Sequence, residues 1–373
     1  MEIPLCRPCF DTEELQEVKK VLESGWVSKG PEAEMFEQSV MKYVGVDHAI
    51  AVVNCTAALH LALLALGIKK GDEVLVADFT FPATGHSVVY CGAKPVFVDV
   101  LPDTYNINIA NIEPLINERT KAIIPVHTFG QPAEMDRLMK IAKENGLSVV
   151  EDCACSLGAT FKGRQTGGIG DIGCFSFHAR KGISTGEGGM VVTNNNDLAN
   201  SARFLSVFGM RPAWERENES EYTVPQFFDI GYNYKLSDIL AAVGVVQMKK
   251  IDSIIKRKRT LAAHYDSRLE DGGFLMKPHV AKGAVHIYQS YVTLVDPKIN
   301  RNRLIMKLRK KGIQTQIGTY ASHVQPVYRS KQSCPVSKDL SERTLALPFF
   351  YSMTHGDIDK VCDVIQSEIS DVL

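Results

Sequence analysis

The sequence predicts an α/β protein with a large domain, in which a mainly parallel sheet lies between helices, and a small C-terminal α+β domain. Two observations carry this prediction. Short runs of β-branched residues alternate with stretches of helical spacing, and the length of 373 residues exceeds that of one average domain. We expect residues 1–250 to form the large domain and residues 251–373 the small one.

The first predicted helix lies near the N-terminus. Thr12 is expected to cap it, Glu13 and Glu14 suit the positive end of the helix dipole, and Gly25 ends it. Four apolar residues of this segment share one face of the helix: Leu15, Val18, Val21 and Leu22.

A βαβ pattern follows this helix. Stretches with helical spacing, such as 57–67 and 134–146, separate short β-branched runs, and this alternation is typical of a mainly parallel sheet with helices on both faces. Two further strand-like runs, 171–177 and 189–193, have no long helix between them, so we expect this end of the sheet to be irregular. The first five predicted strands are 49–53, 73–77, 95–100, 121–126 and 147–152.

The pattern of the sequence changes after Ser237 from alternating short strands and helices to one long helical stretch. A helical pattern runs from there to about Leu269, too long for an uninterrupted ordinary helix, and we expect it to carry the chain from the large domain into the small one. The remainder contains a strand-like run at 286–295, a basic helix at 302–312 and a terminal helix after Thr354, which together predict a small α+β domain.

Composition excludes several classes of protein. Hydrophobic residues make up 45% and charged residues 23% of the chain, as in globular proteins with a large core. The net charge of −1 and the absence of a basic block argue against a nucleic-acid partner. No apolar run approaches the roughly 20 residues of a membrane-spanning helix. The start lacks a signal-peptide pattern, and nine scattered cysteines without a CxxC motif fit a reducing compartment, so we expect a cytoplasmic protein without a metal site.

Ligands of open α/β sheets bind at the carboxyl ends of the strands, so the residues that follow each run are the candidates for a site. The run 49–53 is followed by Asn54, Thr56 and Ala57 at the start of a helix, which can hold a phosphate on its free N–H groups. A simple helix cap is the alternative there. The run 73–77 is followed by Phe81, which can cover a planar ligand or pack in the core.

Two further strand ends carry charged groups. The run 147–152 ends on Asp152, whose carboxylate can pair with a cationic ring nitrogen or lie in a solvated loop. After 171–177 comes Lys181, followed by four glycines between Gly182 and Gly189. Glycine lets the main chain approach a bulky ligand closely, so a solvated charge is a poor explanation of this lysine.

Together, these four places describe pyridoxal phosphate as a cofactor. They supply a phosphate cup, an aromatic ring cover, a carboxylate for a pyridinium nitrogen and a lysine able to form a Schiff base. The carboxylate keeps the ring protonated, and the lysine serves as covalent partner and then as acid and base.

The same stretches resemble the DegT/DnrJ/EryC1/StrS family of aminotransferases, within the fold-type I, aspartate-aminotransferase-like superfamily. The similarity covers nearly the whole chain. The most specific stretches are SGWVSKGP (24–31), DFTFPAT (78–84), EDCACSLGA (151–159), GDIGCFSFHARKGISTGEGGMVVT (170–193) and GYNYKLSDILAA (231–242).

The resemblance implies roles for individual residues. Lys181 would hold the cofactor covalently, Asp152 would bind the pyridine nitrogen, and Phe81 would stack on the ring. Thr56 with the neighbouring backbone at Ala57, together with Ser176, would hold the phosphate. Asn233 would reach the phosphate from the other subunit of a homodimer with shared active sites, which would couple association to cofactor binding.

The resemblance also implies a reaction. An amino donor, glutamate or glutamine, converts pyridoxal phosphate into pyridoxamine phosphate, which then aminates the keto group of a nucleotide-linked sugar in amino-sugar or polysaccharide biosynthesis. Lys181 would carry the proton in each half-reaction as a general acid and base.

Three positions depart from the family pattern. Cys155 stands where the family commonly has Gln or His near the phenolic oxygen of the ring, and a thiol is a weaker hydrogen-bond partner. Cys55 stands in the phosphate cup, and Lys235 replaces a common Arg, which removes a two-pronged grip on carboxylate or phosphate. Candidates for substrate contacts are His127, Lys235, Tyr320 and His323, with a structural role as the alternative for His323.

Four other functions are alternatives to this one. A dehydratase of the same family would replace the lysine, typically by His, whereas Lys181 is present. A non-catalytic binding or regulatory protein on this fold would be expected to lose Lys181 or Asp152. A doubly wound dehydrogenase would need GxGxxG after its first strand, where NCTAALH stands instead. An aminotransferase for a cyclitol ketone remains open.

Overall fold

The computed structural model describes residues 2–210, 224, 226–269 and 273–369. Its longer helices are α1 (Thr12–Ser24), α2 (Pro31–Val44), α3 (Cys55–Ala65), α4 (Ala83–Tyr90), α5 (Met135–Glu144), α6 (Asn196–Ser206), α8 (Asp238–Arg268), α9 (Arg301–Lys310), α10 (Pro335–Arg343) and α11 (His355–Ile369). Short 3-10 turns are η1 (Ile109–Asn111), η2 (Glu113–Leu115), η3 (Thr128–Gly130) and η4 (Pro326–Tyr328).

The strands of the described residues fall into four sheets. The largest contains β1 (His48–Val52), β2 (Glu73–Ala77), β4 (Lys94–Val98), β5 (Thr120–Ile124), β6 (Ser148–Cys153), β9 (Ile172–Ser176) and β10 (Gly189–Thr193). The second contains β11 (Leu275–Met276), β13 (Tyr291–Val295), β14 (Gln316–Ile317) and β16 (Thr344–Leu347). The short strands are β3 (Phe79–Thr80) with β15 (Tyr320–Ala321), and β7 (Thr160–Phe161), β8 (Arg164–Gln165) and β12 (Ala284–Val285).

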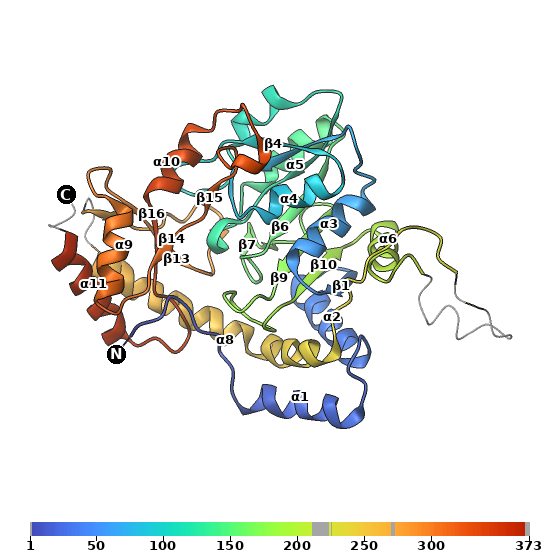
Figure 1. Cartoon of the computed structure of the whole chain (residues 1–373), viewed down its shortest axis with the longest axis horizontal. Helices are drawn as coiled ribbons and strands as arrows, with labels where there is room; N and C mark the ends of the chain where they lie inside the picture. Colours follow the sequence, from blue (N-terminus) through green and yellow to red (C-terminus); the bar gives the residue numbers. More distant parts are fainter. Residues whose placement is uncertain (1, 211–223, 225, 270–272, 370–373) are drawn as a thin grey trace.

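The large sheet has the order β1-β10-β9-β6-β5-β2-β4 and confirms the predicted α/β class (Figure 1). From β4 to β9 neighbouring strands are parallel, whereas β10 is antiparallel to both β9 and β1. The expected irregularity is therefore an antiparallel edge. It arises because only a loop, and no crossover helix, joins β9 to β10.

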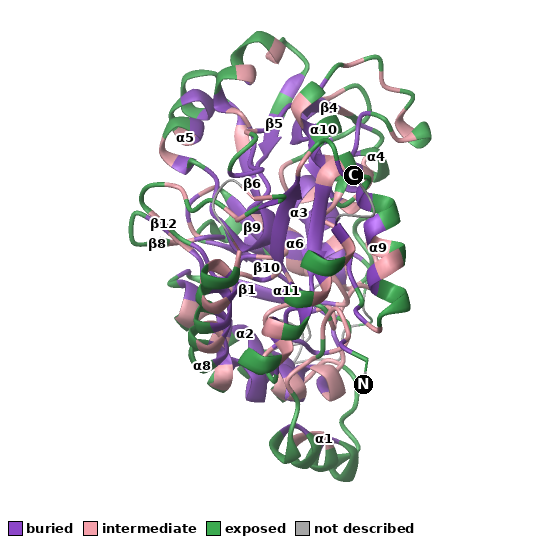
Figure 2. Cartoon of the chain, turned by 90° about the vertical axis from the view of Figure 1, so that its left-hand side faces the viewer, coloured by how far each residue is buried: buried purple, intermediate pink, exposed green. Residues whose placement is uncertain are grey.

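Helices cover both faces of this sheet. One face packs against α3 and α6, with α4 beside them, and the other packs against α2, α8 and α5. Figure 2 shows the strands as the buried interior and the exposed surfaces on the outer sides of the helices. Burial on both faces explains why these strands read as continuous apolar runs rather than as alternating patterns.

The first helix is present, but its cap and its surroundings differ from the prediction. Asp11, one residue before Thr12, accepts from Glu13 N and forms a reciprocal capping box with Glu14. Gly25 ends the helix as predicted, with φ of 74°. Val21 is buried, but Leu15 and Leu22 are 71% and 57% exposed, so the apolar face of α1 lies largely open in one protomer.

The long helical pattern forms one continuous helix of 31 residues, α8, rather than an interrupted one. Ile251 and Ile254 pack in the core beneath the large sheet, whereas Leu261 and Tyr265 pack in the core around β13 and β16. The chain thus passes between cores close to the predicted boundary, which itself stays a prediction. Despite its length, α8 is too polar to cross a bilayer, and no other helix of the described residues has the required length and apolar character.

Part of the N-terminal segment belongs with the second core rather than the first. Ile3 forms a parallel bridge to Ile313 and is buried among the residues around β13. Its N–H donates to Gly312 O, and its own carbonyl accepts from Gln314 N. A division of the chain at a single residue therefore does not describe the two cores completely.

Candidate active site

A cavity of about 470 Å³ opens at the carboxyl ends of the parallel strands, and we call it the main cavity. Its size lies within the range of cofactor and small-molecule sites. Eight of the residues singled out in the sequence line it: Asn54, Cys55, Thr56, Phe81, Asp152, Cys155, Ser176 and Lys181. Strand ends that are far apart in the sequence meet here, as the βαβ pattern predicts.

The N-terminus of α3 forms one wall of the main cavity. Asn54 caps the helix by accepting from Ala57 N at 2.8 Å, so the Ala57 N–H is already used and Ala57 does not line the cavity. Within the described residues, no hydrogen bond occupies the N–H groups of Cys55 and Thr56. These two groups, with the positive end of the helix, are the available anion donors.

Gly189 allows this helix end to approach strand β10. A Cβ atom at Gly189 would lie 2.4 Å from the carbonyl group of Asn54 and 2.6 Å from Cys55 N. Because these contacts are to backbone, any side chain at this position would displace the start of α3. Gly189, one of the four glycines after Lys181, is therefore required for the geometry of the phosphate cup.

Asp152 lies on β6 at the floor of the main cavity and is 4% exposed. Its Oδ2 accepts from Thr84 Oγ1 at 2.8 Å, and its Oδ1 accepts from Ala154 N at 3.1 Å. Burial raises the pKa of the Asp152 carboxyl; the two hydrogen bonds and the charge of Lys181 act in the opposite direction but do not cancel it. A cation beside this carboxylate would favour its ionised form.

Thr84 is a site residue that the sequence reasoning missed. It lies in the first turn of α4, three residues after Phe81, and its hydroxyl also lies 2.9 Å from that of Thr80. The sequence signal for Thr84 was its position in the stretch DFTFPAT, which follows the predicted strand 73–77. That it faces Asp152 depends on the packing of α4 against the sheet.

Lys181 lies in the loop between β9 and β10. Two strand-like hydrogen bonds, from Phe177 N to Gly188 O and from Ala179 N to Gly186 O, hold the loop at 2.9 Å each. The Lys181 amine lies 3.2 Å from the sulfur of Cys155. Burial by itself lowers the pKa of this amine, but acidic neighbours led by Cys155 outweigh it, so the pKa is raised.

Phe81 and Tyr320 lie at the rim of the main cavity. The ring of Phe81 is 64% exposed and meets the ring of Tyr320 edge-on, with centroids 6.2 Å apart. Tyr320 pairs with Thr80 through the β15–β3 ladder, which brings a segment of the second half of the chain to this rim. Thr319 lines the cavity, whereas Tyr320 does not.

Asn233 and Lys235 lie away from the main cavity of their own protomer. Asn233 is exposed and forms a bridge to Val207, and its side-chain oxygen accepts from Lys235 Nζ. The Lys235 amine lies over the ring of Phe208, 4.9 Å from its centroid. Within one chain, the structure does not bring these two predicted residues to those that line the main cavity.

His127 is fully buried and does not line the main cavity. Its Nε2 lies 2.9 Å from Glu151 Oε2, and its Nδ1 accepts from Ala133 N at 3.0 Å. Both ring nitrogens are therefore engaged within the protein. This arrangement favours a structural role over contact with a substrate.

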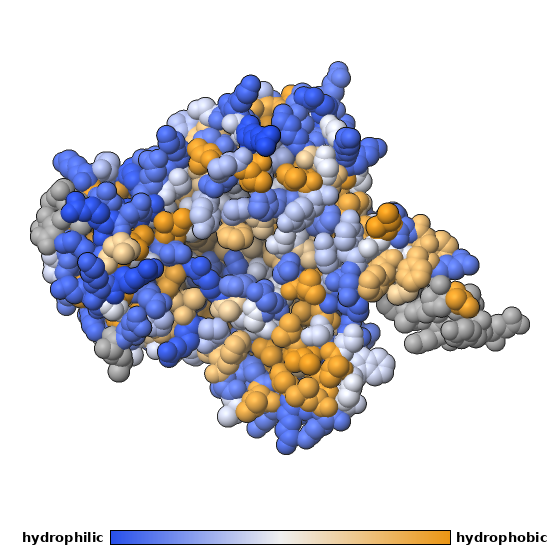
Figure 3. All heavy atoms as spheres, in the orientation of Figure 1, coloured by the Kyte–Doolittle hydropathy of each residue, from blue (hydrophilic) through white to orange (hydrophobic). Residues whose placement is uncertain are grey.

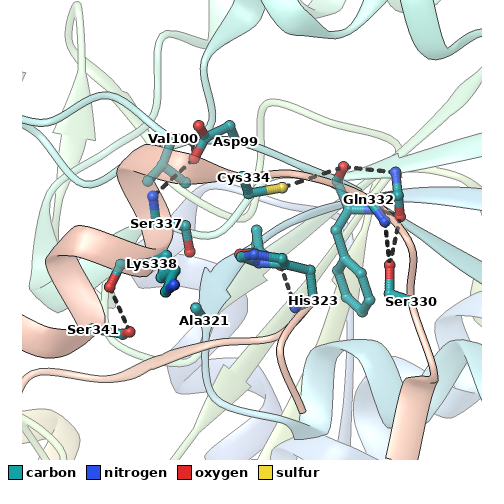
Figure 4. A network of polar contacts seen from close by, with 12 residues as sticks. Asp99, Val100, Ala321, His323, Ser330, Gln332, Cys334, Ser337, Lys338 and Ser341 are labelled. Carbon is teal, nitrogen blue, oxygen red and sulfur yellow. Dashed lines mark hydrogen bonds and ion pairs between the residues drawn. The ribbon is translucent and has the colours of Figure 1, made fainter. Parts of the chain in front are cut away.

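His323 also lies outside the cavity, in a polar network that joins residues 321–341 to the end of β4 (Figure 4). Its Nδ1 and its backbone N each lie 2.6 Å from a carboxylate oxygen of Asp78. Figure 4 also shows the thiol of Cys334 directed at the Phe97 carbonyl oxygen. Burial raises the pKa of the Asp78 carboxyl, and its contacts with His323 only partly oppose this effect.

Two buried groups of potential metal ligands exist among the described residues. Asp78, His323 and Cys334 form one, and His127, Glu151 and Cys153 form the other, each with ligand atoms within 4.8 Å of one another. The histidine and carboxylate atoms are already hydrogen-bonded to each other, and burial raises the pKa of both thiols. Metals bind the thiolate form, so these groups are better explained as internal polar contacts.

The residues around the main cavity fit pyridoxal phosphate. The cavity joins a buried carboxylate held by two donors, a primary amine, an exposed aromatic ring and a helix N-terminus with free N–H groups. These are the groups that a cationic ring nitrogen, an aldehyde, a planar ring and a phosphate require.

Comparisons with known proteins point to the same cofactor. The model of the DegT/DnrJ/EryC1/StrS aminotransferase family matches residues 8–366. The spore coat polysaccharide biosynthesis protein SpsC of Bacillus subtilis is 37% identical over 374 residues, which cover 98% of this chain and 96% of SpsC.

Two solved structures are similar along their whole length. The Spr1654 protein of Streptococcus pneumoniae in its PLP-form has a TM-score of 0.93 and 27% identity, with 100% of both chains covered; a PMP-form is also known. PseC of Helicobacter pylori, an aminotransferase involved in the biosynthesis of pseudoaminic acid, has a TM-score of 0.93 and 26% identity, again with 100% of both chains covered.

Proposed function

The chain belongs to the DegT/DnrJ/EryC1/StrS aminotransferase family and is a pyridoxal-phosphate-dependent aminotransferase, and we propose that it transfers an amino group from glutamate or glutamine to the keto group of a nucleotide-linked sugar. The observation that carries this proposal is that Lys181 and Asp152 line one cavity of cofactor size. The roles of SpsC in polysaccharide biosynthesis and of PseC in pseudoaminic acid biosynthesis support a sugar as the acceptor.

The cofactor is placed by groups from four segments. We assign the covalent link to Lys181, the ring nitrogen to Asp152, one face of the ring to Phe81, and the phosphate to the N–H groups at Cys55 and Thr56 with the hydroxyl of Ser176. All of these residues line the main cavity. When bound, the cofactor withdraws electrons from the carbon that carries the transferred nitrogen.

Lys181 is the group positioned to move the proton. Its amine is held in a loop braced on both sides by backbone hydrogen bonds, and its nearest polar contact is the thiol of Cys155 at 3.2 Å. A thiol is a weak hydrogen-bond partner, so the amine is left available to accept and return the proton of the substrate carbon.

The acceptor half of the site is polar and carries both signs of charge. His178, Arg180 and Glu187 line the main cavity, and Arg180 and Glu187 are exposed. An arginine at the rim suits the carboxylate of an amino donor and the phosphates of a nucleotide. A cyclitol ketone lacks those phosphates and is the second candidate for the acceptor.

A homodimer with shared sites is part of the proposal. Asn233 is exposed and lies outside the cavity of its own chain, as expected for a residue that serves the partner. Figure 3 shows hydrophobic residues gathered over α1. The exposed apolar side chains of α1 and the loop after it are Leu15, Leu22, Trp26 and Val27. An open apolar face of this kind favours association.

We place the reaction in the cytoplasm. All nine cysteines are free, including buried ones such as Cys153 and Cys174. Unpaired cysteines fit a reducing compartment.

Spectroscopy of the purified protein tests the proposal. The visible band of the lysine-bound cofactor should bleach with glutamate or glutamine, and return when a nucleotide-linked keto-sugar is added but not with a cyclitol ketone. Mass spectrometry should then find the aminated sugar. Lys181→Ala should lose the band and the reaction, with the exposed Lys19→Ala as control. Recovery with the cyclitol alone would overturn the sugar assignment, and an unchanged band in Lys181→Ala would overturn the assignment of the lysine.

A further inference from the structure

Behind the active-site loop lies a second lysine, Lys258, which the reaction described so far does not use. It belongs to α8, is only 5% exposed, and donates from its amine to the carbonyl oxygen of Gln289 at 2.8 Å. Its amine also lies 5.3 Å from the centre of the Phe349 ring. A lysine is almost never this deeply buried without a reason, because desolvating an ammonium group is costly.

Lys258 and Lys181 share two internal cavities. One has a volume of about 20 Å³ and also contacts Cys155, and the other has about 10 Å³ and also contacts Arg180. The larger one has room for one water molecule. Both lysines thus line the same two small cavities.

A direct chain of hydrogen bonds also connects Lys258 to the loop of Lys181. Gln289, whose carbonyl accepts from Lys258, donates from its side-chain Nε2 to the carbonyl oxygen of Arg180 at 2.7 Å. Arg180 immediately precedes Lys181. The Gln289 N–H donates in turn to Phe129 O, so this residue is fixed at three points.

The charge of Lys258 has no carboxylate to balance it among the residues that line the two cavities. Burial lowers its pKa to about 8, so the amine is still protonated at neutral pH. The titratable and charged groups that face these cavities come from the N-terminal segment, the strand-end loops and the segment after β16: Cys6, Arg7, Cys9, Cys155, Arg180, Lys181 and Tyr351.

We propose that Lys258 is a positioning residue for Lys181, which fixes the Lys181 loop through Gln289 and, as a buried cation, makes the Lys181 nitrogen release its proton more readily. The acidic neighbours of Lys181 favour its protonated form, and a cation at Lys258 would act in the opposite direction. This inference rests on the proposed covalent role of Lys181. It adds a group to the site that touches neither the cofactor nor the substrate.

The test is a pH titration of the visible band of the holoenzyme. In Lys258→Gln, which keeps a hydrogen-bond donor but no charge, and in Lys258→Met, which keeps neither, the midpoint should rise by on the order of one pH unit, because a nearby cation is removed. Lys258→Arg keeps the charge and should restore the wild-type midpoint. Lys256→Met, on an exposed position of the same helix, is the matched control and should leave it unchanged.

Each outcome decides one question. Equal midpoints in the wild type, Lys258→Gln and Lys258→Met would overturn the inference, and so would an equal rise in Lys258→Arg, because the effect would then be one of packing. If Lys258→Met does not fold by circular dichroism, Lys258→Gln decides. A pH-dependent band that persists in Lys181→Ala would overturn the proposed function instead.

Discussion

The hydroxyl of Thr84 donates to Oδ2 of Asp152 at 2.8 Å, inside the protein and at the floor of the main cavity. Burial raises the pKa of the Asp152 carboxyl, and the bond from Thr84 is the leading contact that lowers it. Thr84 therefore helps to keep ionised the carboxylate that we assign to the ring nitrogen.

Thr84→Val should weaken the binding of pyridoxal phosphate about tenfold to hundredfold, because a hydrogen bond to a charged group contributes about 1.5–3 kcal/mol. The measurement is the dissociation constant of the cofactor for the apoprotein. Thr84→Ser keeps the donor and should bind within about threefold of the wild type. Wild-type affinity in Thr84→Val would show that Asp152 does not depend on this bond.

Glu151→Gln should lower the free energy of unfolding by about 3 kcal/mol, because it removes a buried carboxylate that accepts from His127 Nε2 and faces an amide NH₂ toward backbone N–H donors. The carboxylate accepts from three N–H groups at 167–170. Burial raises its pKa, but His127 and these donors outweigh burial, and the net pKa is lowered.

Because the pKa of Glu151 is lowered in the folded protein, the stability should depend on pH. A lowered pKa in the folded state gives stability that is present above the ordinary value of 4.5 and is lost as the pH falls through the lower folded value. Urea unfolding should thus show a gap between the wild type and Glu151→Gln that is full at pH 6–7 and shrinks below about pH 4.5. Glu144→Gln, at an exposed position, should show no gap. A gap that does not change with pH would contradict an ionised Glu151 carboxylate in the folded state.

Shared sites predict complementation between two inactive variants. Lys181→Ala and Asn233→Leu should each be inactive or nearly so, and mixed dimers should contain one intact site, built from Lys181 of one chain and Asn233 of the other. Random reassociation should restore about a quarter of wild-type activity. If Asn233 serves its own chain, mixing should restore none.

Lys258 predicts that stability depends on pH on the alkaline side. Its pKa is lowered from 10.5 to about 8 by burial, so between these values the unfolded state binds the extra proton and stability rises with pH. Denaturant unfolding should show the wild type gaining up to about 3 kcal/mol relative to Lys258→Met between about pH 8 and 10.5. If the free energies of unfolding of the two proteins change in parallel over this pH range, the Lys258 amine is not neutral in the folded state.

The sequence predicted well those features that depend on local pattern. The strands of the large sheet are recognisable because burial on both faces makes them apolar throughout. Lys181 and Asp152 could be located because the strand ends of a parallel sheet meet at one edge. The position of the helix after Ser237 could also be predicted, but the sequence did not indicate that this helix is continuous.

Features that depend on contacts between distant segments were not accessible in this way. A helical period defines an apolar face on α1 but not its partner, and Leu15 is exposed here. His127 follows a strand on the expected side, yet its ring turns toward Glu151. Thr84 and Lys258 carry no motif, because their roles arise only when α4 and α8 pack around the site.

The bridge between Ile3 and Ile313 has a consequence for synthesis on the ribosome. Roughly 300 residues separate the two partners, and at about 5–20 residues per second a ribosome needs roughly 15–60 seconds to make them. During that time the apolar segment around Ile3 lacks the partners that bury it in the folded protein. In the nascent chain the segment around Ile3 is thus exposed until the segment around Ile313 emerges, and a chaperone that holds residues near Ile3 would act during this interval.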